Sequence, residues 1–288
     1  MIVKEFDSAD LFLTEYEAVL LEREAAAQLL FSFARQGRSD YASGKNMFGV
    51  VEENKAILLY GLNQGVDLIV YTADKEVEEA AARVLADYLG NSHIMISTLN
   101  ARPTFCQSFL EQYKIYLKGT FIRKLESEIM ELRQLNEIMP AAGSQRLAMD
   151  EDIKLVADWM IQYQIEALMD EADYEDAVQR ATWLIEHKEL YLYEDEENCI
   201  VSMAAATRAL VHGVAITYVF TPEEYRGIGY AAANVYYLCK ALLEQGYEFC
   251  TLYVDKKNPL SQRAYEKVGF QVIEDNYEYN IIQSKEAL

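Results

Sequence analysis

The chain has 288 residues, of which 51% are hydrophobic and 25% are charged, so it is long enough to form two medium-sized domains, each with its own core. Acidic residues outnumber basic ones by 47 to 26, which gives a formal net charge of −21. This charge argues against a nucleic-acid partner, because binding a phosphate backbone needs a positive surface. A cationic small molecule or peptide amine suits the charge better, although acidic surfaces also serve solubility alone.

The cysteines and the N-terminal segment bear on the compartment. No Cys-x-x-Cys pair is present, and the cysteines lie in apolar runs, so we expect buried, reduced thiols rather than a disulfide framework or a zinc site: Cys106, Cys199, Cys239 and Cys250. Residues 1–24 contain scattered acids and no unbroken apolar segment, and nowhere do 18 apolar residues run together. The three histidines have no metal-ligand spacing. We therefore expect a cytoplasmic protein without a metal site or a membrane partner.

The first half of the chain predicts a mixed α/β pattern. The runs AILLYGL and VDLIVYT flank Asn63-Gln64-Gly65, a short polar turn with glycine that predicts a β-hairpin. A helix is expected over 74–89, where apolar residues recur on one face. A strand HIMISTL, a short helix over 103–113 and a strand over 113–122 follow.

The second half repeats this pattern after a break. The run Pro-Ala-Ala-Gly-Ser at 140–144 is the best linker, so we predict an N-terminal domain over 1–135, a linker over 136–144 and a C-terminal domain over 145–288. Helices over 150–168 and 174–187 are followed by a hairpin of LYLY and CIVSMAAA. The strand VAITYVFT, a helix over 231–245, the strand FCTLYV, a short helix over 261–268 and the strand QVIEDNYEYNI complete the chain. A tandem duplication would explain the similar order of the two halves.

A glycine-containing loop precedes the helix over 231–245. Its residues Arg226-Gly227-Ile228-Gly229-Tyr230-Ala231 lie where the first N–H groups of a helix are unpaired, which favours an anion such as a pyrophosphate. Glycines allow close approach of the ligand, and Arg226 adds a positive charge. The alternative is an ordinary turn whose glycines serve packing. The first half has YTADKEVEEA at this place, with acids that would repel an anion, so only the second half is predicted to bind one.

The same glycines also satisfy the dinucleotide-binding pattern Gly-x-Gly-x-x-Ala, with Asp255 at the end of the next strand. A Rossmann strand runs almost directly into its first glycine, whereas residues 221–226 intervene here. Too little chain follows Asp255 for the remaining βα units. We therefore reject a dinucleotide-binding fold.

The run VFTPEEYRGIGYA, followed by LYVDKKNPLSQRAYEKVGF, resembles the acetyl-CoA-binding core of the GNAT N-acetyltransferase superfamily. The loop pattern of that family is Arg/Gln-x-x-Gly-x-Gly/Ala, which Arg226, Gly229 and Ala231 satisfy. The resemblance covers 145–288, and the whole chain resembles bacterial predicted acetyltransferases with a degenerate N-terminal GNAT-like half. It implies an α/β fold of tandem GNAT-like domains, each a mixed, mostly antiparallel sheet flanked by helices, and an N-acetyltransferase that uses acetyl-CoA as co-substrate.

The resemblance also implies roles for particular residues. The strand before the loop would splay from its neighbour and contact the pantetheine arm, the loop would hold the pyrophosphate, and Asn258 would bond the cofactor arm or cap the next helix. Tyr265 would be the general acid that protonates the leaving thiolate. The expected cofactor-binding residues are Val219, Phe220, Thr221, Arg226, Gly227, Ile228, Gly229, Tyr230, Ala231 and Asn258.

The resemblance leaves the base and the acceptor open. The strand VAITYVFT has no carboxylate, so the general base is unassigned, and Glu166, Asp170 and His212 are candidates by location only. The acceptor is expected to be a small-molecule or peptide amine, and the acidic run EALMDEADYED at 166–176 would favour a cationic one. The N-terminal half would shape the acceptor cleft or form an oligomer interface. The alternatives are a non-catalytic acyl-CoA-binding or regulatory module, and transfer of a longer acyl group.

Overall fold

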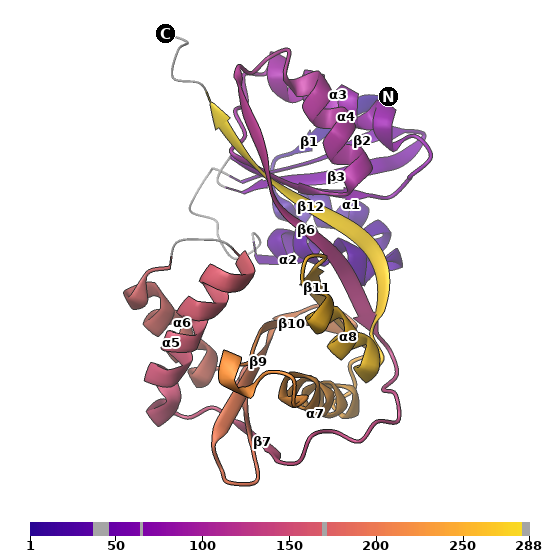
Figure 1. The fold of residues 1–288 in the computed structure, drawn as a ribbon. Helices are drawn as coiled ribbons and strands as arrows, with labels where there is room; N and C mark the ends of the chain where they lie inside the picture. Colours follow the sequence, from indigo (N-terminus) through magenta and orange to yellow (C-terminus); the bar gives the residue numbers. More distant parts are fainter. Residues whose placement is uncertain (37–45, 64–65, 169–171, 284–288) are drawn as a thin grey trace. The chain divides into compact units, whose positions relative to one another are not determined.

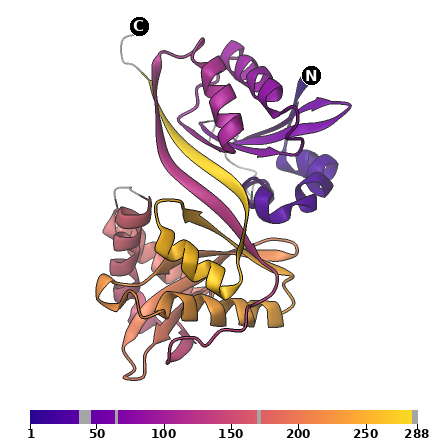
Figure 2. The same cartoon turned by 45° about the vertical axis from the view of Figure 1, so that its right-hand side comes forward.

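A computed structural model describes residues 1–36, 46–63, 66–168 and 172–283 (Figures 1 and 2). The chain forms two compact units: unit 1 comprises Met1–Ser127 and Glu274–Leu288, and unit 2 comprises Glu128–Ile273. The chain passes from unit 1 to unit 2 within strand β6 (Gly119–Leu132) and returns within strand β12 (Gln271–Gln283). The segment 136–144, expected as a linker, lies within unit 2, and most of the last strand contributes to unit 1.

Unit 1 is a sheet with two pairs of helices. Helices α1 and α2 come between the first two strands, and α3 and α4 flank β5. The elements are β1 (Ile2–Phe6), α1 (Ala9–Glu22), α2 (Glu24–Gln36), β2 (Met47–Glu53), β3 (Lys55–Asn63), β4 (Asp67–Thr72), α3 (Glu78–Asn91), β5 (Thr98–Ala101), α4 (Pro103–Tyr113) and β6.

Unit 2 has the same order of strands and α-helices, with three short helical turns added. The elements are β7 (Ser144–Leu147), η1 (Asp150–Asp152), α5 (Ile153–Tyr163), the π-helical η2 (Gln164–Leu168), α6 (Tyr174–Glu186), β8 (Leu190–Glu194), β9 (Ile200–Ala209), β10 (Gly213–Phe220), η3 (Glu223–Tyr225), α7 (Tyr230–Glu244), β11 (Phe249–Asp255), α8 (Pro259–Val268) and β12. Both halves of the sequence therefore read β-α-α-β-β-β-α-β-α-β.

The two halves exchange their last strands. The sheet order is β1-β2-β3-β4-β5-β12 in unit 1 and β6-β11-β10-β9-β8-β7 in unit 2. In unit 1, residues 277–280 of β12 pair antiparallel with residues 98–101 of β5. In unit 2, the Thr251 hydroxyl on β11 donates to the carbonyl of Met130 on β6 over 2.9 Å. Each half of the sequence thus completes the sheet of the other, which the expected division at 136–144 did not foresee.

The sheets are mixed and mostly antiparallel, so the predicted fold class is confirmed. Strand β4 pairs parallel with β5, and β10 pairs parallel with β11, whereas the other pairs with a described register are antiparallel. The unit 2 sheet packs its two faces against different helices. One face and helices α7 and α8 enclose a core that contains Ile216, Leu238 and Leu252, and the other face packs on α5 and α6 through Met203 and Phe220.

Most of the elements expected from sequence are present. The predicted hairpins are β3 with β4 and β8 with β9, and the predicted helix over 103–113 is α4. The strand HIMISTL is shorter than expected, because β5 begins only at Thr98. The last strand of the first half, expected over 113–122, is the longer β6. We made no prediction for α1 and α2.

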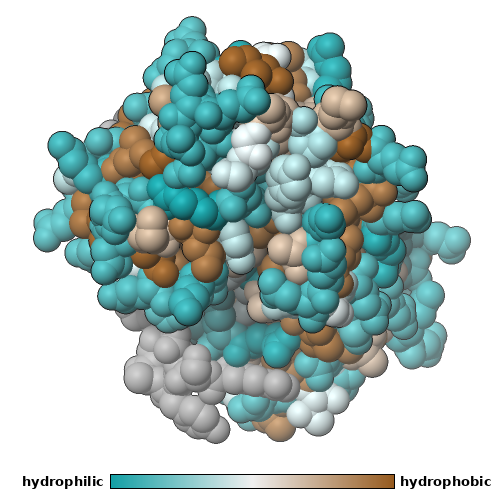
Figure 3. Space-filling view, turned by 90° about the horizontal axis from the view of Figure 1, so that it is seen from below, coloured by the Kyte–Doolittle hydropathy of each residue, from teal (hydrophilic) through white to brown (hydrophobic). Residues whose placement is uncertain are grey.

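The surface, the cysteines and the helices can be compared with what the composition predicts. On the face seen in Figure 3, hydrophilic residues surround smaller hydrophobic areas. All four cysteines are free thiols, and Cys106, Cys239 and Cys250 are buried, but Cys199 is exposed, contrary to expectation, because it lies in the turn before β9. Within the described residues, no helix has the length and apolar character needed to cross a membrane.

Candidate active site

Strands β10 and β11 pair at their beginnings only, and β10 continues unpaired with β11 toward the predicted glycine loop. Their parallel pairing covers only residues 213–215 of β10 and 249–251 of β11, after which both strands continue. Residues 216–220 of β10 therefore face β11 across a widening gap rather than a hydrogen-bonded ladder. The sequence resemblance implied this splay, and it exposes one edge of β10 where a ligand can add its own hydrogen bonds.

The glycine loop forms the start of α7. Gly229 is the N-cap residue with φ of +106°, and Gly227 has φ of +84°, so both need the backbone freedom of glycine. Among the described residues, no side chain caps this helix start. The first N–H groups of α7 therefore remain available to an anion, and the helix dipole adds positive potential there.

The space beside these two glycines distinguishes a binding loop from a packing turn. A Cβ at Gly227 would have no heavy atom within 4 Å, and a Cβ at Gly229 would meet only the Ala141 methyl at 3.9 Å. Gly269 differs, because a Cβ there would lie 2.6 Å from the carbonyl oxygen of Gln134. The loop glycines therefore do not serve tight packing against the protein, which was the alternative left open by the sequence.

Arg226 is held beside the loop by two hydrogen bonds. Its Nη2 donates to the Glu166 carboxylate over 2.6 Å, and its Nε donates to the carbonyl oxygen of Thr221 over 2.9 Å. The guanidinium also lies 5.7 Å from the ring centroid of Phe220. Both side chains of the ion pair are more than 40% exposed, so an incoming anion can compete with Glu166 for Arg226.

The strand residues before the loop are arranged by a buried serine. The Ser202 hydroxyl donates to the carbonyl oxygen of Phe220 over 3.0 Å and accepts from the Thr221 hydroxyl over 3.1 Å. The Phe220 side chain is buried against α5 and α6, whereas Val219 packs on the core of α7 and α8. These contacts attach the end of β10 to β9 and to the cores on both faces of the sheet.

Asn258 and Tyr265 both lie at α8. The Asn258 side chain accepts from the N–H of Ser261 over 3.1 Å, so it caps α8, and Pro259 occupies the first turn. Tyr265 is 7% exposed and packs edge-to-face on Phe270. Burial raises the pKa of Tyr265, and the nearby Tyr163 adds to this shift. A tyrosine in this state keeps its proton at neutral pH.

The acidic run 166–176 and the candidate bases are only partly described. Glu166 is paired with Arg226, and Asp173 caps α6 by accepting from the N–H groups of Glu175 and Asp176. Asp170 and Glu171 lie outside the described residues. His212 is exposed just before the start of β10, at the end of that strand opposite to the loop. Because an eight-residue strand spans roughly 25 Å, His212 is far from the glycine loop, and its candidacy as the base stays a prediction.

A cluster of aromatic and basic side chains on the α5 and α6 face of the sheet was not found by sequence reasoning. The rings of Tyr163 on α5 and Tyr218 on β10 have centroids 5.5 Å apart. The Arg180 guanidinium on α6 lies 4.8 Å from the Trp183 ring and 5.8 Å from the Tyr218 ring. Arg208 on β9 interacts electrostatically with Tyr163, Tyr218 and Arg180 and with Tyr253 on β11.

Tyr218 lies in a β-bulge of β10. Between Thr217 and Phe220 the strand has one residue more than β9, where the partners are Ala205 and Met203. Tyr218 has φ of +51°, a left-handed conformation that is rare for a residue with a bulky side chain. The bulge turns the ring toward Tyr163 and Arg180. Strain of this kind is concentrated at functional sites, which marks Tyr218 as a candidate site residue.

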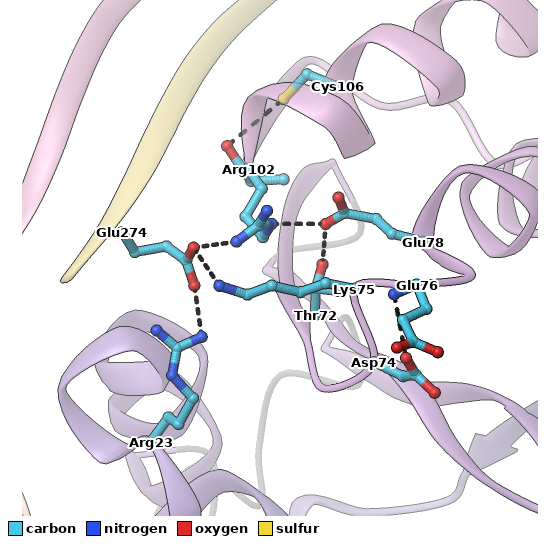
Figure 4. A network of polar contacts seen from close by, with 10 residues as sticks. Arg23, Thr72, Asp74, Lys75, Glu76, Glu78, Arg102, Cys106 and Glu274 are labelled. Atoms are coloured by element: carbon cyan, nitrogen blue, oxygen red, sulfur yellow. Dashed lines mark hydrogen bonds and ion pairs between the residues drawn. The ribbon is translucent and has the colours of Figure 1, made fainter.

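Acidic residues of the protein lie beside the corresponding helix start in unit 1, where Figure 4 shows a network of polar contacts. Helix α3 begins at Glu78, whose carboxylate is 1% exposed and accepts from the Thr72 hydroxyl over 2.5 Å and from Nε of Arg102 over 2.9 Å. Arg102 also pairs with Glu274 of β12. Neither α3 nor α7 has a side-chain cap, but α3 has the acidic residue Glu78 in its first turn, whereas the first turn of α7 has none.

Glu274 extends this network to three cations. Besides Arg102, it pairs with Arg23 and Lys75, each over 2.8 Å, and its side chain is only 8% exposed. Because Glu274 belongs to β12, these ion pairs tie the exchanged strand to three connecting segments of unit 1. Arg23 lies between α1 and α2, Lys75 between β4 and α3, and Arg102 between β5 and α4. The sequence predicts that acids at the α3 start disfavour an anion in the first half, and this stays a prediction, because Glu78 and Glu274 are both paired with cations.

Comparisons with known proteins agree with this architecture. Residues 153–270 match the model of the acetyltransferase (GNAT) family. No curated protein matches the chain. A GCN5-related N-acetyltransferase from Sphaerobacter thermophilus has a similar structure, with a TM-score of 0.60, 15% identity and coverage of 100% of this chain and 97% of that chain.

Two further solved structures extend over nearly the whole chain. A Drosophila protein has a TM-score of 0.61 at 12% identity and covers 99% of each chain. A GNAT-family acetyltransferase from Colwellia psychrerythraea has a TM-score of 0.55 at 14% identity and covers 98% of this chain and 100% of its own. At these identities the similarity establishes the fold, and it does so for both halves of the chain.

The segment that matches the acetyltransferase family makes up most of unit 2, and the solved structures bear on the fold of the whole chain. The match of residues 153–270 to the GNAT family model confirms, for that segment, the resemblance seen in the sequence. The matched segment contains the splayed strands, the glycine loop and Tyr265.

Proposed function

We propose that unit 2 transfers an acetyl group from acetyl-CoA to a primary amine by direct attack. One observation supports this most strongly. The uncapped start of α7 has open space beside Gly227 and Gly229, at the point where β10 and β11 separate. A pyrophosphate against the loop would leave the pantetheine arm to run along the free edge of β10. Residues 226–231 would bind the pyrophosphate, and Val219 to Thr221 would line the arm.

The transfer is a nucleophilic substitution at the thioester. The neutral amine attacks the carbonyl carbon, a C–N bond forms, and the oxyanion needs hydrogen-bond donors such as N–H groups at the free edge of β10. The C–S bond then breaks, and the departing thiolate needs a proton. Tyr265 would supply it, because burial keeps its hydroxyl protonated at neutral pH. The amine gives up its own proton to solvent or to a base that remains to be assigned.

The acceptor is proposed as an amine of a small molecule or peptide. The net charge of −21 would attract its cationic form. Within the acidic run, however, Glu166 is paired with Arg226 and Asp173 caps a helix, so these two carboxylates have roles without an acceptor. We place the protein in the cytoplasm, where a reducing environment would keep its four cysteines as the free thiols observed.

The test is turnover of acetyl-CoA with a panel of primary amines. Acetylated product is measured by mass spectrometry, because the exposed Cys199 would itself react with a thiol reagent. We expect product with at least one amine, and none with the Gly229→Val variant. Acetyl-CoA binding without any turnover would instead support the alternative, a non-catalytic acyl-CoA-binding module. Turnover with a longer acyl-CoA but not with acetyl-CoA would change the donor and keep the mechanism.

A further inference from the structure

A chain of hydrogen bonds runs through the interior of unit 2 to the arginine of the glycine loop. Its members, here called the Ser202 network, come from β7, α7, β9 and the segment after β10: Gln145, Asn234, Ser202, Thr221 and Arg226. Asn234 and Ser202 are fully buried. Polar groups in a protein core cost stability unless they are bonded, so a network of this kind needs an explanation beyond packing.

The Ser202 hydroxyl is the centre of the network. It donates to the carbonyl oxygen of Phe220 over 3.0 Å, accepts from the Thr221 hydroxyl over 3.1 Å and accepts from Nδ2 of Asn234 over 3.5 Å. One donor and two acceptor positions are the full capacity of a hydroxyl group. Ser202 therefore joins the end of β10 to the first turns of α7, which are the two sides of the proposed pyrophosphate site.

Gln145 holds Asn234 from β7. Its Nε2 donates to Oδ1 of Asn234 over 2.6 Å and to the main-chain carbonyl oxygen of the same residue over 2.7 Å. Asn234 lies in the second turn of α7, the helix whose N-cap is Gly229. Asparagine is a poorer helix former than leucine or alanine, and an apolar side chain would need no partner in this place. The observed bonds compensate for this cost and attach α7 to β7 and β9 close to the glycine loop.

Thr221 connects the centre of the network to Arg226. Its hydroxyl donates to Ser202, and its carbonyl oxygen accepts from Nε of Arg226 over 2.9 Å. The guanidinium also lies 5.7 Å from the ring centroid of Phe220. A guanidinium is planar, so the bond at Nε and the ring contact together restrict its orientation. Its Nη2, which donates to Glu166, is the group that a phosphate would take over.

From these bonds we propose that Ser202, Asn234 and Gln145 are positioning residues for the pyrophosphate of acetyl-CoA. Through Thr221 they orient Arg226, and through α7 they place the N–H groups of the glycine loop, so that both sets of donors meet one ligand. None of the three touches the ligand in this account. Donors that are held in place before binding lose less freedom on binding, which raises affinity. The proposal rests on the proposed acetyl-CoA site and adds the residues that support it.

Thr221→Val tests the link between Ser202 and Arg226, because it keeps the branched shape of the side chain and removes the hydroxyl. Isothermal titration with acetyl-CoA should show a Kd about fivefold higher, the effect of roughly one neutral hydrogen bond. Thr221→Ser, which keeps the hydroxyl, should bind within about twofold of the unmodified protein. Ser202→Ala should weaken binding about fivefold or more, and Asn234→Leu by about two- to fivefold, because its contact with Ser202 is the longest in the network.

A second background separates positioning from direct contact. If the Thr221 hydroxyl acts through Arg226, Thr221→Val should change the Kd by less than about twofold in a protein that already carries Arg226→Gln. The matched control is Thr182→Val, which removes another half-buried threonine hydroxyl, bonded to the carbonyl oxygen of Val178 in α6 over 2.8 Å. This control should leave the Kd for acetyl-CoA unchanged.

Several outcomes would overturn the proposal. An equal loss of affinity for Thr221→Val with and without Arg226→Gln would mean that the hydroxyl contacts the ligand itself. Unchanged affinity in Thr221→Val, or an equal loss in Thr182→Val, would remove the network from cofactor binding and leave the acetyl-CoA site intact. No binding to the unmodified protein would overturn the proposed function and this proposal with it. The threonine variants carry the test alone if Ser202→Ala does not fold.

Discussion

The two ends of helix α7 allow the loop to be tested against a matched control. Gly229 at its start has φ of +106°, and Gly246 just after its end has φ of +103°. Neither position has a heavy atom close enough to clash with an added Cβ. Gly229→Ala and Gly246→Ala therefore impose nearly the same backbone strain on the same helix. Left-handed conformations cost an L-residue about 1–2 kcal/mol, so both variants should lower Tm by roughly 2–8 °C.

Only Gly229→Ala should affect the cofactor. The new methyl group occupies the open space through which a phosphate would approach the first N–H groups of α7. Loss of one charge-assisted hydrogen bond costs about 1.5–3 kcal/mol, which corresponds to a roughly 10- to 150-fold higher Kd for acetyl-CoA. Isothermal titration of both variants, with Tm measured in parallel, separates strain from obstruction. Equal affinities in the two variants would refute the assignment of the loop to the pyrophosphate.

Three further predictions follow from individual contacts. Tyr265→Phe keeps the packing on Phe270 and removes the acid, so kcat should fall about 100-fold or more with an unchanged Kd for acetyl-CoA. Glu166→Gln releases Arg226 from an exposed ion pair and should tighten acetyl-CoA binding by about two- to fivefold in titrations at low salt, whereas Arg226→Gln should weaken it at least about 10-fold. Glu78→Ala breaks a buried ion pair and should destabilise the protein by about 3 kcal/mol in urea unfolding, whereas Glu79→Ala, on an exposed side chain, should cost under about 0.5 kcal/mol.

Each of these predictions has an outcome that contradicts it. An unchanged kcat for the Tyr265 variant removes this residue from the acid role. Weaker cofactor binding after Glu166→Gln would mean that Glu166 supports the ligand rather than competing with it. Equal stability of the two glutamate variants of α3 would show that the carboxylate at the helix start does not hold unit 1 together.

Local sequence signals were sufficient for the elements and the loop. The polar residues 63–65 and the acidic residues 194–198 each lie between apolar runs in the sequence, and the strands on either side pair as expected, although residues 64–65 lie outside the described part of the chain. The two loop glycines have positive φ, and their surroundings are open, as close approach of a ligand requires. The sequence also predicted the difference between this loop and the acidic start of α3, because it places Glu78 at the beginning of that helix.

The remaining features depend on contacts between residues far apart in the chain. Glu274 and Arg102 are separated by 172 positions, and Arg226 and Glu166 by 60. No local sequence pattern indicates that either pair of residues is in contact. The strand exchange and the ion pair of Glu166 with Arg226 therefore could not be predicted. The aromatic and basic side chains that gather on the α5 and α6 face of the sheet come from five elements, and each tyrosine alone looked like a packing residue. The bulge that strains Tyr218 depends on the register of β10 against β9, which a single strand sequence does not specify.

The central claim is that the chain has one acetyl-CoA site, formed by the loop in unit 2. Isothermal titration of the full-length protein with acetyl-CoA tests it directly, since it reports both affinity and stoichiometry. The predicted result is one site per chain with a micromolar Kd, lost in Gly229→Val. No binding to the unmodified protein, or binding that survives this substitution, would contradict the claim. Two sites per chain would contradict the prediction that unit 1, with its acidic α3 start, does not bind acetyl-CoA.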